Sequence, residues 1–262
     1  MDLELKGRTA FITGANGGIG RAIAAAFAAE GVHLGLFTRN ADKCLDFAEK
    51  LKNTHGIRAI VTAFDFERPE SIPGAVASSV KQLGAVDILV NNAGGAARGR
   101  LEDLTDEAWD KRFAVKPIGL MRMTREVLPY IVKSNQARII NIAGTRGREP
   151  SIFSVMSGPI NFGTLSATKV LANALGPRGI TVNAVNPGST DTQRWDELKR
   201  LTAADLKVSL EEAEKHLLRE VPLGRVVRTT DVADLVLFLA SARAGMINGS
   251  AINVDGGRTR SI

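Results

Sequence analysis

The chain has 262 residues, of which 44% are hydrophobic and 26 are glycine, and its formal net charge is +6. This length and composition predict one sizeable globular domain over residues 1–262 that can bury a full core without cross-links. The basic residues are dispersed among 28 acidic ones and only 5% of the residues are aromatic, so we expect no nucleic-acid partner and favour small anionic molecules.

The cysteine content and the hydropathy of the chain indicate its cellular compartment. Cys44 is the single cysteine, which excludes an intrachain disulfide and favours a reducing environment. Acids precede any apolar run at the N-terminus, and no stretch reaches the roughly 18 apolar residues of a membrane span. We therefore expect a cytoplasmic protein without a membrane partner.

Short apolar runs rich in β-branched residues alternate with longer stretches of helical period. The expected strands are residues 8–13, 33–38, 58–64, 86–91, 137–143, 180–185 and 250–254. Helical patterns fill the gaps, for example at 21–30 and 106–132. This alternation predicts a doubly wound parallel sheet covered by helices on both faces. The polar segment 189–220 has a helical charge pattern and is predicted to form a pair of lid helices.

A glycine-rich segment, TGANGGIG at 13–20, follows the first expected strand. Glycines at a strand-to-helix turn let the backbone approach a pyrophosphate, and the helix N-terminus offers free N–H groups. The segment predicts a dinucleotide site; a glycine turn without a ligand is the alternative. The residues expected in this site are Gly14, Asn16, Gly18, Ile19 and Gly20.

Arg39 follows the second strand, where an acid would accept hydrogen bonds from a ribose 2′-hydroxyl. An arginine there favours a 2′-phosphate, so NADP(H) is preferred over NAD(H), unless Arg39 is only a solvated residue at a strand end. Asp65, after the third strand, is placed to meet polar atoms of the adenine.

Four segments at family-like spacing resemble the signature of short-chain dehydrogenases/reductases, in the branch of the 3-oxoacyl-carrier-protein reductases. They are TGANGGIG at 13–20, NNAG at 91–94, VNAVNPG at 182–188 and NVDGG at 253–257. The resemblance spans the chain and implies a single-domain α/β fold, a Rossmann-like sheet of seven parallel strands in the order 3-2-1-4-5-6-7. It also implies further cofactor-binding residues, which are Asn92, Ala93, Gly94, Pro187, Gly188, Ser189 and Thr192.

The catalytic residues of that family do not match. The family uses an Asn in the fourth helix, a Ser after the fifth strand, and a Tyr and a Lys one helical turn apart. Alignment on VNAVNPG places Gly144 at the Ser position, Ser157 at the Tyr position and Asn161 at the Lys position. Alignment of the fourth helix places Lys116 at the Asn position. The resemblance therefore implies an atypical member whose single tyrosine, Tyr130, is expected in the core or a subunit contact.

Lys116 is the first candidate to replace the missing group. A buried lysine shifts its pKa readily, so Lys116 could hold an oxyanion, act as acid or base, or form a Schiff base. The alternative is a lysine that fills space and reaches water. Pro117 is expected to kink the surrounding helix and to aim Lys116 inward.

Hydroxyl and amide groups complete the candidate catalytic set, which is Lys116, Thr145, Ser157 and Asn161. Ser157 could donate to a substrate carbonyl, but the following Gly158 and Pro159 favour a helix N-cap. Thr145 is the best nearby hydroxyl for polarising a carbonyl.

Arginines follow two strand ends, at Arg98, Arg100, Arg146 and Arg148. They suit a carboxylate, phosphate or carrier thioester, and solvated loop arginines are the alternative. We assign Arg98, Arg146 and Arg148 to the substrate, and no metal site is expected.

Three functions remain open at this point. They are an NADP(H)-dependent carbonyl/alcohol oxidoreductase with a non-standard proton relay, a non-redox lyase or isomerase using Lys116, and a catalytically silent dinucleotide-binding protein. The family resemblance implies a homodimer or homotetramer.

Overall fold

Seven parallel strands form one sheet in this computed structural model, which describes residues 2–95, 99–152 and 154–261. The strands are β1 (Thr9–Thr13), β2 (His33–Thr38), β3 (Ala59–Ala63), β4 (Ile88–Asn91), β5 (Arg138–Ile142), β6 (Thr181–Pro187) and β7 (Ala251–Val254). Their order is β3-β2-β1-β4-β5-β6-β7, which confirms the predicted topology.

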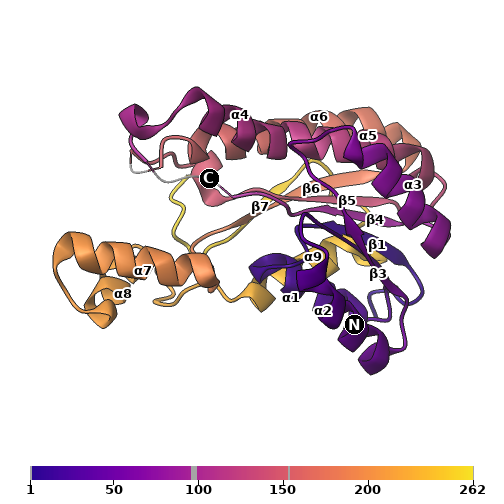
Figure 1. Ribbon diagram of the computed structural model, residues 1–262, viewed down its shortest axis with the longest axis horizontal. Coiled ribbons are helices and arrows are strands. Elements are labelled where there is room, and N and C mark those ends of the chain that lie inside the picture. The colour runs from indigo at the N-terminus through magenta and orange to yellow at the C-terminus, as the bar shows by residue number, and fades with distance from the viewer. Residues whose placement is uncertain (1, 96–98, 153, 262) are drawn as a thin grey trace.

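Helices connect the strands and cover both faces of the sheet (Figure 1). They are α1 (Gly18–Ala29), α2 (Asp42–His55), α3 (Ser71–Leu83), α4 (Asp106–Val115), α5 (Ile118–Ile131), α6 (Ser157–Leu175), α7 (Gln193–Leu206), α8 (Leu210–Leu218) and α9 (Thr229–Ala240). Short 3₁₀ turns are η1 (Leu101–Asp103), η2 (Thr145–Gly147), η3 (Gly176–Arg178) and η4 (Ala242–Ala244).

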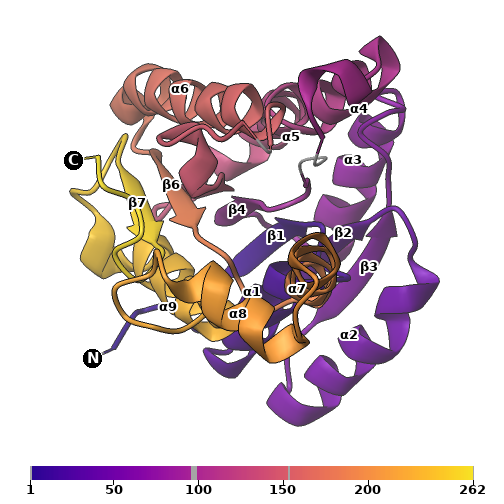
Figure 2. The ribbon, with the colours of Figure 1, turned by 90° about the vertical axis from the view of Figure 1, so that its left-hand side faces the viewer.

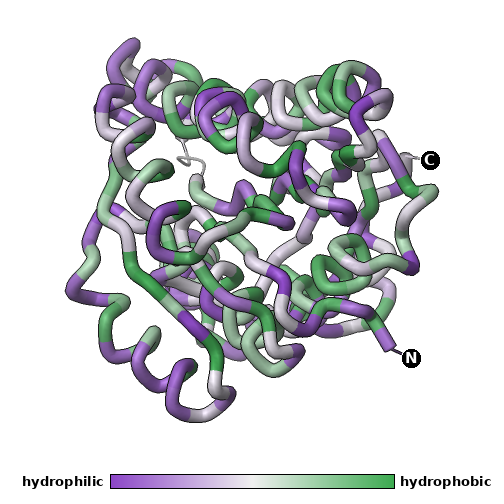
Figure 3. The backbone as a smooth tube through the Cα atoms, turned by 90° about the vertical axis from the view of Figure 1, so that its right-hand side faces the viewer, coloured by the Kyte–Doolittle hydropathy of each residue, from purple (hydrophilic) through white to green (hydrophobic). Residues whose placement is uncertain are grey.

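An apolar cluster packs on each face of the sheet, because successive strand residues point to opposite sides. In β1, Ala10 and Ile12 pack with α1, α2 and α9, whereas Phe11 packs with α3, α5 and α6. All five residues of β1 are buried, as expected for a strand covered on both faces. Along the covering helices, hydrophilic and hydrophobic stretches alternate (Figure 3).

The expected helix over 106–132 is divided at Pro117, so the prediction of one kinked helix was wrong. The α4 helix ends at Val115, Lys116 is extended with φ −137° and ψ 138°, and α5 begins at Ile118. Proline lacks the N–H that a helix requires and disfavours the helical conformation in the residue before it. The effect on Lys116 is nevertheless the predicted one, since its side chain is buried.

The polar segment 189–220 forms the predicted pair of helices, α7 and α8. In Figure 1 the pair projects beyond the sheet and the helices that cover it, and in Figure 2 the pair faces the viewer. Within it, the buried Trp195 donates its indole N–H to Glu214 at 3.2 Å, and Lys199 lies 3.8 Å from the same carboxylate. These contacts join the two helices to each other.

Candidate functional site

The glycine turn after β1 is packed as closely as the dinucleotide prediction requires. Gly14 has φ +69°, and a Cβ there would lie 2.8 Å from the Cα of Ala93. A Cβ on Gly20 would collide with the carbonyl oxygen of Gly14 and would lie 2.6 Å from Asn92 Nδ2. Both positions therefore need glycine so that β1, α1 and the end of β4 can meet.

Thr13 ties the ends of β1 and β4 together and was missed as a site residue. Its Oγ1 accepts hydrogen bonds from the backbone N–H groups of Asn92 and Ala93, both at 3.0 Å. Asn92 returns two bonds, from Nδ2 to the carbonyl oxygens of Thr13 at 3.0 Å and Gly14 at 3.2 Å. The sequence does not predict this contact, because Thr13 and Asn92 are 79 residues apart along the chain.

The residues after β6 complete the same side of the sheet. Gly188 packs on Asp255, with only 2.9 Å between a Cβ placed there and the Asp255 Cβ. Ser189 accepts a backbone hydrogen bond from Val227 at 3.0 Å. Thr192, just before α7, approaches the turn after β1: a Cβ on Gly18 would lie 2.7 Å from Thr192 Cγ2. The structure thus brings the segment after Pro187 to the glycine turn.

The start of α1 fits a dinucleotide pyrophosphate. Gly17 is the N-cap residue of α1 and has an extended backbone. No atom lies within 4 Å of a Cβ placed on Gly17, and no side chain caps the helix. The first turn, from Gly18 through Ile19 to Gly20, holds no acid, so its N–H groups and partial positive charge are available to an anion. Asn16, half-buried, directly precedes this N-cap.

Arg39 and Asp65 lie at the ends of neighbouring strands, but with different surroundings. The Arg39 side chain is 70% exposed and lies 3.6 Å from the Glu67 carboxylate. Asp65 accepts a bond from the backbone N–H of Glu67 at 3.0 Å. Arg39 is thus open to a 2′-phosphate, whereas Asp65 orders its own loop.

Lys116 is a buried amine at the carboxyl ends of β4 and β5, only 8% exposed. Its Nζ donates to the carbonyl oxygens of Ile142 at 2.5 Å and Ala143 at 3.3 Å. The methylene groups of Lys116 pack against Gly94: a Cβ on Gly94 would lie 2.7 Å from Lys116 Cε. Burial first, and the positive charge of Arg194 second, lower the pKa of Lys116 to about 8.

Two further arginines gather at the loop after β4, and both were missed as site residues. Arg112 donates from Nη1 to the Gly95 carbonyl at 3.3 Å. A Cβ on Gly95 would lie 3.2 Å from Arg194 Nη1. Arg194 belongs to α7, about a hundred residues away along the chain, so no local pattern could place it here.

The loop after β5 packs against the start of α6 through small residues. Thr145 begins η2 and is buried. A Cβ on Gly147 would lie 2.9 Å from the Asn161 backbone carbon, and one on Gly144 would lie 3.4 Å from Asn161 Nδ2. Asn161 itself donates from Nδ2 to the Ser157 carbonyl at 2.9 Å, within its own helix. Thr145 and Asn161 therefore lie in adjoining elements, η2 and α6.

Ser157 is not the N-cap that we favoured. It is the first residue of α6, the preceding Met156 is already helical, and no side chain caps the helix. The Ser157 hydroxyl is buried and lies 2.5 Å from the Ser154 hydroxyl. The preceding turn, closed by the Ser157 N–H on the Ser154 carbonyl, already carries the chain into the helix and makes a cap unnecessary.

The three arginines assigned to the substrate differ in their surroundings. Arg98 lies outside the described residues. Arg148 donates to the Ala251 carbonyl at 2.9 Å, so its guanidinium holds the loop to β7. Arg146 lines a hollow together with residues of the C-terminal tail. Arg100, in contrast, stands exposed before η1.

Metal-ligating side chains do not gather in the part of the chain that the structure describes. Within it, no group of three or more His, Cys, Asp and Glu side chains is placed to hold a metal ion. None of the described helices is long and apolar enough to cross a membrane.

The fold and this site define a dinucleotide-binding α/β protein. Comparison with known proteins narrows the class. Residues 14–259 match the family model described as enoyl-(acyl carrier protein) reductase. A 3-oxoacyl-(acyl-carrier-protein) reductase from Aquifex aeolicus is 33% identical over 260 residues, which cover 98% of this chain and 99% of the relative.

Solved structures agree with that match. The L-sorbose reductase from Gluconobacter frateurii, complexed with NADPH and L-sorbose, has a TM-score of 0.95 and 30% identity over the full length of both chains. A 3-ketoacyl-(acyl-carrier-protein) reductase from Brucella melitensis, complexed with NADH, has a TM-score of 0.85 and 30% identity over 98% of this chain and 100% of the other. The chain belongs to the short-chain dehydrogenases/reductases, a family of oxidoreductases, and is similar to its ketoacyl reductases.

Proposed function

We propose that this protein is an NADPH-dependent reductase that uses Lys116 in place of a tyrosine to hold the transferred proton. The supporting observation is the position and state of Lys116: a buried amine with a pKa of about 8, at the carboxyl ends of the strands where ligands bind in open α/β sheets. Family membership, and a glycine turn that suits a dinucleotide, support a redox enzyme over a lyase, an isomerase or a catalytically silent protein.

The chain's own residues suit this chemistry. A reduced nicotinamide, when bound, supplies the hydride. The residues that would hold the dinucleotide are those of the glycine turn, Asn92, Ala93, Gly94 and the segment from Pro187 to Thr192, while Arg39 would pair with the 2′-phosphate. An ammonium has three N–H groups and Lys116 uses two on backbone carbonyls, so one remains for a carbonyl oxygen.

The proton balance is simple. The substrate oxygen takes a proton from Lys116 Nζ while its carbon is reduced, and water then restores the ammonium. A pKa near 8 suits this role because an acid works best with a pKa near the working pH. Thr145, Ser157 and Asn161 would orient the substrate, which we propose to be a small anionic or thioester-bearing carbonyl compound because of the arginines beside η2.

The test compares Lys116→Met with Lys111→Met, an exposed lysine of α4. NADPH oxidation is followed with a panel of carbonyl acids and 3-oxoacyl thioesters. We expect Lys116→Met to lower kcat by about 10²-fold or more with little change in NADPH affinity, and Lys111→Met to behave as wild type. For the wild type, kcat/KM falls as the pH rises through about 8, and Lys116→Met lacks that limb.

Three outcomes would contradict the proposal. Absence of NADPH binding in a fluorescence titration would remove the reductase itself. Full activity of Lys116→Met would remove Lys116 from the reaction, and turnover without NADPH would favour the lyase or isomerase.

Subunit pairing is part of the same proposal. Exposed apolar side chains lie on α5 and α6, among them Ile118, Met121, Phe162 and Val170. Together with the family resemblance, they support a homodimer or homotetramer that covers these two helices.

A further inference from the structure

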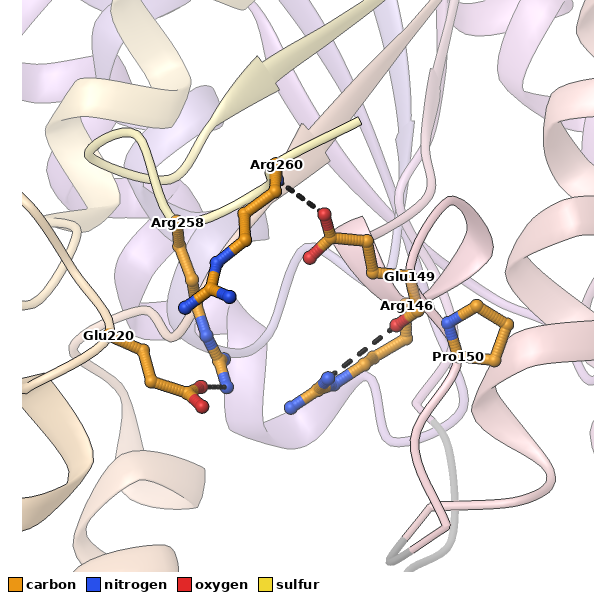
Figure 4. A pocket seen from close by; sticks show the side chains of 6 residues that line it. All are labelled: Arg146, Glu149, Pro150, Glu220, Arg258 and Arg260. Atoms are coloured by element: carbon orange, nitrogen blue, oxygen red, sulfur yellow. Dashed lines mark hydrogen bonds and ion pairs between the residues drawn. The ribbon is translucent and has the colours of Figure 1, made fainter. Parts of the chain in front are cut away.

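Three distant segments of the chain meet around a hollow of about 230 Å³ (Figure 4). They are the loop after β5, the end of the lid segment 189–220 and the C-terminal tail, residues 255–261. The tail begins at Asp255, which is buried and accepts hydrogen bonds from the backbone N–H groups of Gly257 at 3.0 Å and Thr259 at 2.9 Å. Because Gly188 packs on Asp255, the tail starts beside the segment expected to bind the cofactor.

The other end of the tail is held by one carboxylate of the loop after β5. Glu149 accepts hydrogen bonds from the backbone N–H groups of Arg260 and Ser261, the latter at 3.0 Å. Figure 4 shows the Glu149 side chain directed at the main chain of Arg260. Arg258 also pairs with Glu220 at 2.8 Å, but the Glu220 side chain is 62% exposed, and exposed ion pairs contribute little. Hydrogen bonds to a carboxylate are stronger, so Glu149 is the main attachment of the tail.

Glu149 also belongs to the stretch of backbone that holds Thr145. Its own N–H donates to the Thr145 carbonyl at 3.0 Å, and the N–H of Arg148 donates to the same oxygen at 2.9 Å. The main chain of Glu149 is thus bound to Thr145, while its side chain is bound to the tail. One residue therefore joins the tail to the candidate hydroxyl of η2.

The start of α6 packs on the same loop. A Cβ on Gly158 would lie 3.3 Å from Pro150 Cβ, and a Cβ on Gly147 would lie 2.9 Å from the Asn161 backbone carbon. Groups packed this closely transmit a displacement from one to the next. A shift of Glu149 would therefore move η2 and its contact with α6.

We propose that the C-terminal tail is a strap that sets the place of η2, and that Glu149 is a positioning residue that acts on the reaction through Thr145. The inference rests on the proposed reductase function only for the role of the Thr145 hydroxyl, which would polarise the substrate carbonyl. A displacement of about 1 Å can cost about 10²-fold in rate. Loosening of η2 without loss of Thr145 should cost less, about tenfold.

The test removes the two sides of the attachment separately. Glu149→Ala removes the carboxylate, whereas Arg260→Pro together with Ser261→Pro removes both N–H groups, since proline has none. We expect each variant to lower kcat about tenfold with NADPH affinity unaltered, and the two to cause no further loss when combined. Glu30→Ala, which removes an exposed glutamate at the end of α1, should behave as wild type. If Glu149→Ala does not fold, the proline variant gives the same readings, because it changes only the tail.

A second comparison separates positioning from support of the fold. In a Thr145→Ala background, Glu149→Ala should cost no further activity, because the group that Glu149 positions is gone. A loss of the same size in both backgrounds would show that Glu149 only supports the fold and would overturn the inference. Wild-type kcat in either attachment variant would overturn it as well.

Hydrogen exchange tests the strap without the reaction. The backbone N–H groups of Gly147, Arg148 and Glu149 close the turn η2. We expect those of Gly147 and Arg148 to exchange about tenfold faster in Glu149→Ala and at the wild-type rate in Glu30→Ala. Faster exchange, but no reduction of any carbonyl compound, would leave the strap standing and remove the reductase. Unaltered exchange in both attachment variants would remove the strap, and reduction of a carbonyl compound by the wild type would leave the reductase standing.

Discussion

Lys116 shows how burial sets the behaviour of a single residue. Its pKa of about 8 lies below the roughly 10.4 of a free lysine, so the unfolded chain binds more protons between these two pH values. The free energy of unfolding should therefore rise by about 3 kcal/mol from pH 8 to pH 10.5 on account of Lys116. Below pH 8 both states carry the proton and the full cost of burying the charge is present.

This prediction is checked by urea denaturation of wild type and Lys116→Met across that range. All other ionisable side chains are common to both proteins, so the difference between the two curves isolates Lys116. A difference that stays constant with pH would show that Lys116 keeps an ordinary pKa when folded.

At the same scale, we expect Arg39 to set the preference between NADPH and NADH. Its exposed guanidinium can add a charge-assisted bond to a 2′-phosphate, which NADH lacks. We expect Arg39→Ala to weaken NADPH binding about tenfold while NADH binding is unaltered. Arg68→Ala removes a similarly exposed arginine from the next loop and serves as the control. Equal losses for both cofactors would contradict the prediction.

Among the elements, α9 depends on a charged cap. Asp231 accepts hydrogen bonds from the Arg228 backbone N–H at 2.9 Å and from the Arg228 and Arg225 side chains. Bonds from Arg228 first, and Arg225 second, hold the pKa of Asp231 far below its ordinary value. A carboxyl with a depressed pKa stabilises the fold above its unfolded pKa of about 4, and this contribution is lost as the pH falls toward the folded value.

Asp231→Asn should therefore cost about 1 kcal/mol at neutral pH, since both arginines are largely exposed and screened. The difference from wild type should narrow below pH 4. Asp234→Asn, an exposed acid one turn later, should cost little. Thermal unfolding measures all three proteins, and an equal loss from both variants would rule out the capping role.

At the scale of the whole molecule, the exposed apolar residues of α5 and α6 lead us to predict that these helices pair between subunits. The Phe162 side chain is 63% exposed, which is costly for a residue that is not covered by a partner. Phe162→Glu should convert a dimer or tetramer into smaller species in light-scattering measurements. Met246→Glu, at a position 97% exposed outside the helices, should not. A wild-type monomer would contradict the prediction directly.

The sequence by itself determined the parallel sheet and the glycine turn, because buried parallel strands read as apolar runs and a close backbone approach requires glycine at Gly14 and Gly20. The order of the strands followed from the resemblance of four sequence motifs to a known family. Only the tertiary structure decided what surrounds Lys116. The carbonyls of Ile142 and Ala143, and the charge of Arg194, come from β5 and α7, far from Lys116 along the chain. The same holds for Arg146, Glu220 and Arg260, which meet only because the lid segment and the C-terminal tail return to the end of β5. Local sequence patterns predict whether one segment forms a helix, a strand or a turn. The pKa of a buried amine and the charge of a hollow depend instead on residues that only folding brings together.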